Sequence, residues 1–174
     1  MIPQTKWFDR TWEFKFPVGY FPVILERFRG TPARIEELVR NLPAEIIPVR
    51  VGDAWSIQEH IGHLLDLSDL DDRRMADYLA GAETLSVADL QNRKTHEANY
   101  NSQVLQNILR DFRKSREAIV RKMEPLTEEQ VARVAIHPRL KQPMRLVDWV
   151  YFMAEHDDHH IARMTGNART LLKK

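Results

Sequence analysis

The stretch RLVDWVYFMAEHDDHHIARMTGNAR, residues 145–169, decides the fold, because it reads as one amphipathic helix whose apolar face is interrupted by histidine. Its apolar residues recur at steps of three and four, the period of one helix face. They are Leu146, Trp149, Val150, Met153, Ile161 and Met164. Continued from Met153, this face reaches positions 156, 157 and 160, and two of these three are histidine. Unpaired polar groups are costly in an interior, so these inward imidazoles need a partner.

The spacing of His156 and His160 suggests what that partner is. Side chains four residues apart project from the same helix face, with Cβ atoms about 5–6 Å apart. Two ring nitrogens at that spacing can reach one divalent metal ion. A lone histidine on an apolar face is better interpreted as a hydrogen-bonded core residue, but a pair on that face favours a metal site.

Bulk composition indicates a single globular domain over residues 1–174, with 43% hydrophobic and 29% charged residues. The net charge of +1 argues against nucleic-acid binding by bulk electrostatics. We expect a soluble, cytoplasmic protein without a membrane segment, because the N-terminus lacks a signal-peptide core and no long uninterrupted apolar run occurs. The chain has no cysteine, so any metal site must use histidine, aspartate or glutamate.

Three further helices are predicted upstream. Residues 1–19 form an extended lead, and Thr31-Pro32 then predicts a helix start with Thr31 as N-cap. Whether residues 20–29 and 32–42 form one kinked helix or two stays open. Ser56-Ile57-Gln58-Glu59 is a capping box that opens a second helix running to about Ala80, with Gly81 as its stop.

A third helix is predicted over residues 101–123, and the fourth follows Pro143. Residues 81–100 and 131–144 are long connections, and the chain shows almost no strand pattern. The sequence therefore predicts an all-α four-helix bundle with long connections between helices two and three and between helices three and four. The first of these is long enough to let helices two and three run parallel.

The second helix offers two candidates for a third metal ligand, His60 and His63. On a helical wheel, His60 lies nearer the centre of the apolar face and His63 lies at its edge, so spacing alone leans slightly to His60. His96 and His137 fall in the long connections, and we expect both to be exposed to solvent.

Trp55-Ser56, His63-Leu64-Leu65-Asp66 and His156-Asp157-Asp158-His159-His160, in this order on the second and last helices, resemble the DinB/YfiT-like family. The resemblance covers residues 21–166. It implies a four-helix bundle in which one histidine of the second helix and two of the last bind a divalent metal, zinc or nickel. The ligands it implies are His63, His156 and His160. It leaves His60 and His159 beside the metal as candidate catalytic or substrate-facing residues.

Three neutral histidines would leave the metal its charge and an open coordination position, as in catalytic sites. The resemblance then implies a metal-dependent enzyme acting on a small molecule, either a hydrolase or a thiol-dependent transferase or isomerase. A low-molecular-weight thiol is a candidate partner, and we allow for a homodimer. The alternative is a metal-stabilised binding or stress-response module without turnover. A pocket lined by the two connections would favour the enzyme.

Ligand histidines usually donate their second ring N–H to an acceptor. Asp66, Glu155 and Asp158 are the candidates by proximity in sequence.

Other metal motifs fit less well. His156-Asp157-x-x-His160 is similar to the metalloprotease motif H-E-x-x-H, but aspartate is shorter than glutamate. Di-iron bundles need Glu-x-x-His on two helices, and the sequence lacks a second such motif. A bundle without metal remains the alternative.

Overall fold

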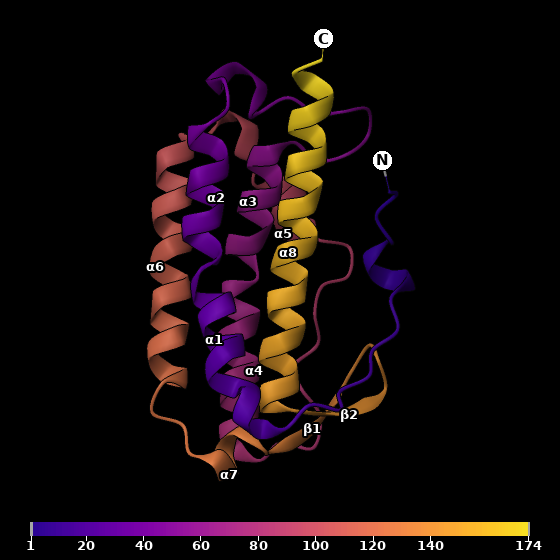
Figure 1. The fold of residues 1–174 in the computed structure, drawn as a ribbon, viewed down its shortest axis with the longest axis vertical. Coiled ribbons are helices and arrows are strands. Elements are labelled where there is room, and N and C mark those ends of the chain that lie inside the picture. The colour runs from indigo at the N-terminus through magenta and orange to yellow at the C-terminus, as the bar shows by residue number, and fades with distance from the viewer. Residues whose placement is uncertain (1, 174) are drawn as a thin grey trace.

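Four helical rods lie side by side in the computed structural model, which describes residues 2–173 (Figure 1). The rods are α1 (Phe21–Arg29) with α2 (Thr31–Arg40), α3 (Ile57–Asp66) with α4 (Ser68–Ala80), α6 (Leu105–Met123), and α8 (Leu146–Leu171). Two short helices, α5 (Arg93–Glu97) and α7 (Glu128–Val131), lie in the connections. The predicted four-helix bundle is confirmed.

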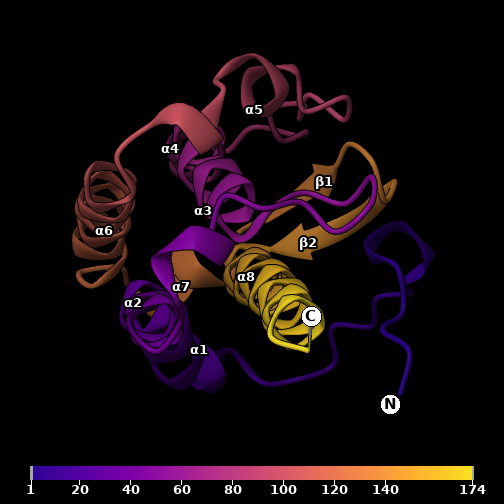
Figure 2. The ribbon, with the colours of Figure 1, turned by 90° about the horizontal axis from the view of Figure 1, so that it is seen from above.

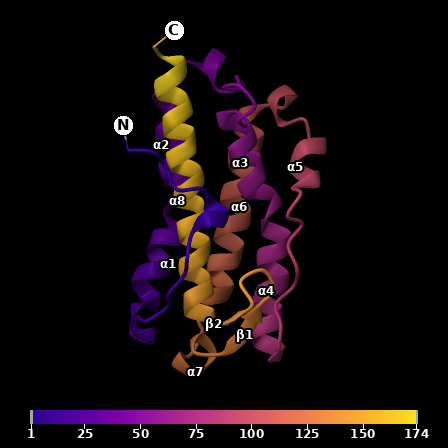
Figure 3. The ribbon, with the colours of Figure 1, turned by 90° about the vertical axis from the view of Figure 1, so that its right-hand side faces the viewer.

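The rods do not simply alternate in direction. After α4, the chain returns along the outside of the bundle to α5 (Figure 3). As a result, α6 runs parallel to α3 and α4, as predicted, while α1, α2 and α8 run the opposite way (Figure 1). Seen from above, α3 and α8 are neighbours and α6 lies across from α8 (Figure 2). This arrangement brings the histidines of the second and last rods to one place.

The second rod begins and ends at the predicted residues. The Ser56 side chain accepts a hydrogen bond from the Glu59 backbone N–H, and Glu59 caps in return. Gly81 closes the rod in a left-handed conformation, with φ 71°. The prediction of one continuous helix is wrong at Leu67, where the backbone N–H reaches both His63 and Leu65 carbonyls. The rod therefore divides at Leu67 into α3 and α4.

Two other helix starts differ from the prediction. The first rod consists of two helices that meet at Gly30, and Thr31 is not an N-cap. Its hydroxyl donates instead to Asp157 Oδ2 at 2.7 Å, which joins α2 to α8. The third rod begins at Leu105 rather than near residue 101, because Tyr100–Ser102 forms a separate 3-10 turn.

The second long connection contains a hairpin that the sequence did not reveal. β1 (Val134–His137) pairs antiparallel with β2 (Gln142–Arg145). Residues of the first connection extend this hairpin, since the Leu85 N–H donates to the Ile136 carbonyl at 3.0 Å. Strands of only four residues are too short to show a clear alternation, and Pro143 within β2 weakens the signal further.

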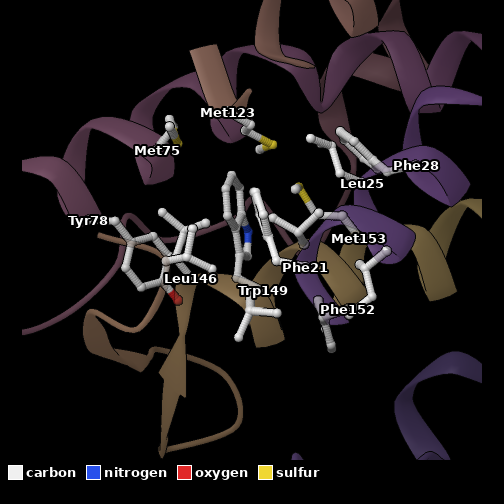
Figure 4. Close-up of a cluster of buried hydrophobic side chains, with 14 of the residues drawn as sticks. Phe21, Leu25, Phe28, Met75, Tyr78, Met123, Leu146, Trp149, Phe152 and Met153 are labelled. Atoms are coloured by element: carbon white, nitrogen blue, oxygen red, sulfur yellow. The ribbon is translucent and has the colours of Figure 1, made fainter. Parts of the chain in front are cut away.

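Two apolar clusters fill the bundle. The cluster at the hairpin end surrounds the fully buried Trp149 and includes Phe21, Tyr78 and Met123 (Figure 4). The other cluster lies toward the opposite end, around Ile61. Within residues 2–173, no helix is both long and apolar enough to cross a membrane.

Candidate metal centre

His63 of α3 and His156 and His160 of α8 come together at one point of the bundle. One ring nitrogen from each lies within 4.8 Å of those of the other two. His156 Nε2 and His160 Nε2 face each other at 3.2 Å. The structure thus brings together the three residues that the resemblance implied as ligands.

A hydrogen-bond chain fixes how the His63 ring is presented. Its Nδ1 lies 3.2 Å from the Thr95 hydroxyl, which itself donates to Asp66 Oδ2 at 2.9 Å. Tyr100 also donates to Asp66, at 2.7 Å. Because the Thr95 proton is given to Asp66, Thr95 accepts from His63 Nδ1–H. The lone pair of His63 is therefore on Nε2, which is the arrangement that metal-ligating histidines have.

His60 contacts the centre through another histidine. Its Nδ1 lies 2.8 Å from His160 Nδ1. When His160 binds through Nε2, its Nδ1–H donates to His60, and the His60 proton then lies on Nε2. That nitrogen is buried and has no partner among the described residues. The helical wheel slightly favoured His60 as the third ligand. In the structure, His60 instead contacts His160 and orients its ring, and His63 belongs to the cluster of converging ring nitrogens.

The predicted N-terminal lead closes one side of the centre. Gln4 Nε2 lies 3.1 Å from His159 Nδ1. The N-terminal segment therefore holds the ring of His159, one of the two candidate catalytic residues. Trp7 packs edge-on against His156, with ring centroids 4.8 Å apart, and against Phe152 at 4.9 Å. These aromatic contacts shield the ligand rings from water.

Burial keeps the imidazoles of this centre uncharged. It lowers the pKa of His60 to about 3 and that of His63 to about 4, with a smaller contribution from neighbouring positive charge. It also lowers the pKa values of His156 and His160 well below the usual range. A metal ion binds only unprotonated imidazole, so three converging neutral rings fit a divalent ion.

The centre opens into a pocket of about 620 Å³. Both long connections contribute to its wall, through Val87–Leu90 and His137–Arg139. Trp55 lies over the ligand rings, with its centroid 4.8 Å from that of His63. A pocket lined by both connections is thus present, which is the feature that we expected to favour an enzyme over a binding module.

Behind the centre lies a buried ion pair that we did not predict from the sequence. Arg116 of α6 donates to Asp157 at 2.6 Å, and the two side chains are 5% and 3% exposed. The sequence does indicate that Arg116 is buried, because it follows Phe112 by four residues on the inward face of its helix. The pair ties α6 to the ligand-bearing turn of α8.

Two of the three acceptor candidates do not contact the ligand rings, and the expectation that His137 is exposed was wrong. Glu155 and Asp158 do not accept from the ligand rings, because both are bound by Arg27. Asp66 alone of the three candidates supports a ligand, through Thr95. His137 is not solvent-exposed but 2% exposed in the pocket wall, because the hairpin folds over the site. His96 is exposed as predicted.

The fold matches a solved structure of YfiT from Bacillus subtilis, which is described as a probable metal-dependent hydrolase with an unusual four-helix bundle topology. The two share 16% sequence identity with a TM-score of 0.80, and the match covers 93% of each chain. At this identity the likeness establishes the fold. A comparison with curated proteins finds no significant match.

The family is established by the sequence itself. The profile of the DinB superfamily matches residues 27–164, which is most of the chain and includes every histidine of the centre. The chain belongs to the DinB superfamily.

Proposed function

We propose that this protein is a metal-dependent hydrolase of a small molecule, with zinc or nickel held by Nε2 of His63, His156 and His160. The observation that carries the proposal is the convergence of three unprotonated ring nitrogens on an accessible pocket of about 620 Å³. When bound, such an ion acts as a Lewis acid and brings the pKa of a coordinated water to about 7.

The protein residues around the ion have separate roles in this proposal. Thr95 and Asp66 orient His63, and His60 accepts from His160 Nδ1–H and orients that ring. The free Nε2–H of His60 is the donor that we assign to a substrate oxygen. Trp7 and Trp55 exclude bulk water from the ligand rings, which strengthens polar interactions within the pocket.

An accessible pocket supports an enzyme over a metal-stabilised binding module. A structural zinc site usually has four protein ligands and no open position. Here three histidines meet, no cysteine is present in the chain, and the pocket reaches the rings. The description of YfiT as a probable metal-dependent hydrolase points to the same reaction class.

A hydrolysis screen tests the proposal. Untagged protein, stripped by a chelator and reloaded with zinc or nickel, is assayed against small esters, amides and phosphoesters, with and without a low-molecular-weight thiol. We expect metal-dependent turnover without thiol, abolished in His156→Ala and retained in His96→Ala, whose ring is exposed. Turnover only with thiol would make the protein a transferase, and tight binding without any turnover would favour the binding module.

A further inference from the structure

The pocket has a second group of polar side chains, away from the metal centre. Arg74 of α4, His137 at the end of β1 and Arg139 in the hairpin turn all line it. We call these three residues the basic cluster. They are separate from the histidines that would hold the metal, and the proposed hydrolysis gives them no role so far.

Backbone pairing brings the basic cluster together. Arg74 Nε donates to the Ser86 carbonyl at 3.0 Å, and the adjacent Leu85 pairs with Ile136 of β1. Arg74 is thereby fixed beside His137, the next residue of that strand. Phe152 of α8 lies beside both His137 and Arg139. Its ring centroid is 5.2 Å from that of His137 and 5.7 Å from the Arg139 guanidinium.

Two donors of this cluster, one on His137 and one on Arg139, lack acceptors. Arg74 is 5% exposed and His137 is 2% exposed. The Leu140 N–H donates to His137 Nδ1, so the ring proton lies on Nε2. Both His137 Nε2 and Arg139 Nη2 are buried without a hydrogen-bond partner in the described chain. Among residues 2–173, no carboxylate forms an ion pair with Arg74 or Arg139.

Asp71 and Asp77 lie one turn of α4 on either side of Arg74. Neither forms an ion pair with it, and Asp77 accepts from the Ser86 N–H instead. Asp71 lies in the same pocket. Burial and the neighbouring Asp157 outweigh the nearby arginines and raise the pKa of Asp71 to about 7. At neutral pH this carboxyl is only partly ionised. Buried cations without counter-charge are costly, and aromatic rings such as Phe152 compensate only in part.

We propose that Arg74, His137 and Arg139 bind an anionic group, a carboxylate or a phosphoryl group, of the molecule that enters this pocket. Guanidinium groups and a ring N–H form charge-assisted hydrogen bonds with such oxygens. The assignment of this anionic group to a substrate rests on the proposed hydrolase function. In that function, the anionic group anchors the substrate in the pocket. Phe152 precedes His156 by four residues, which corresponds to about 6 Å along the helix. The basic cluster and the metal centre are therefore about one helical turn apart along α8, so the anionic group of the substrate lies to one side of the bond to be cleaved.

Calorimetric titration with two probes, inorganic phosphate and succinate, tests the site directly. Protein as purified should bind at least one probe saturably, and the tighter probe identifies the group. Arg74→Met and Arg139→Met should each weaken that binding about tenfold or more. The matched control is Arg73→Met, on the exposed face of the same helix, which should bind like the parent. If Arg74→Met fails to fold, Arg139→Met decides, because its backbone lies in a turn.

One further variant separates this site from the metal. His156→Ala removes a proposed metal ligand, and phosphate or succinate should still bind to it. Binding that survives there but is lost in Arg139→Met supports the basic cluster even if no hydrolysis is found. Binding that is lost in His156→Ala and kept in Arg139→Met would place the anion on the metal and overturn the proposal. Absence of saturable binding by either probe would overturn it as well.

Discussion

Single hydrogen bonds set the direction of two of the ligand rings, those of His63 and His160. Thr95 is the clearest case, because its hydroxyl accepts from His63 Nδ1–H and donates to Asp66. Groups that orient a metal ligand in this way typically contribute a factor of 10–100 in metal affinity. The polar residues around the rings are therefore as much a part of the site as the rings themselves.

Thr95→Val should weaken zinc binding roughly 10- to 100-fold, because the isosteric side chain cannot accept the His63 proton. Competition with a chromophoric chelator measures the change. Thr170→Val is the control, since Thr170 is exposed near the end of α8. Equal affinities of Thr95→Val and the parent would show that the chain does not orient His63.

Gly62 of α3, next to the ligand candidate His63, lies against the Tyr100 ring. A Cβ at this position would overlap that ring, and Tyr100 is bound to Asp66. Gly62→Ala should lower the free energy of unfolding by about 1–3 kcal/mol through overpacking. Gly166→Ala, where a Cβ meets nothing within 4 Å, should instead raise it by about 0.5–1 kcal/mol. Urea unfolding distinguishes the two, and a stable Gly62→Ala would contradict the close packing.

At the scale of the helix, α8 joins the parts of the site. It carries two of the three ligand candidates, and its Asp157 is held by Arg116 of α6 and Thr31 of α2. The inward-facing residues of α8 thus contribute both to the metal centre and to this buried ion pair. The pair fixes the position of α8 relative to its neighbours.

Breaking this pair should be costly. Asp157→Ala leaves the Arg116 charge buried without its partner and should lower the unfolding free energy by about 3–5 kcal/mol. Asp72→Ala removes an exposed partner of Lys122 and should cost less than about 1 kcal/mol. Chemical denaturation of the two variants tests the difference. Similar small losses for both would mean that the buried pair contributes little.

Periodicity was sufficient to predict the rods, because each buries a long apolar face. It could not predict the hairpin, whose strands are short, nor that Thr31 bonds to Asp157, a contact distant in sequence. The wheel could not decide between His60 and His63, because both lie on the buried side of α3. The resemblance supplied that choice. The basic cluster escaped prediction because Arg139 reaches the pocket only through the fold of the hairpin.

At the scale of the whole molecule, buried neutral histidines make stability depend on pH. The pKa is about 3 for His60 and His137 and about 4 for His63, in each case lowered mainly by burial. An unfolded imidazole has a pKa near 6.5. Below that pH these histidines bind more protons in the unfolded chain than in the folded one. Their contribution to the free energy of unfolding therefore decreases as the pH falls.

Metal-free protein should therefore lose stability as pH falls from about 6.5 toward 4, because these histidines together outweigh Asp71, whose raised pKa of about 7 has the opposite effect. The loss approaches about 1.4 kcal/mol per pH unit for each histidine that stays neutral in the folded state. Denaturant midpoints at pH 7.5, 6 and 5 measure it. His60→Asn should reduce the slope, whereas His96→Asn, at an exposed ring, should not. A flat profile between pH 7.5 and 5 would contradict the burial of uncharged rings.

The central claim is that His63, His156 and His160 hold one metal ion. The most direct test is elemental analysis of untagged protein purified without added metal. We expect close to one zinc or nickel per chain, most of it lost in His63→Ala, His156→Ala and His160→Ala and most of it kept in His60→Ala. Parent protein without metal that also fails to take up zinc or nickel would contradict the claim, as would loss of the metal in His60→Ala but not in His63→Ala.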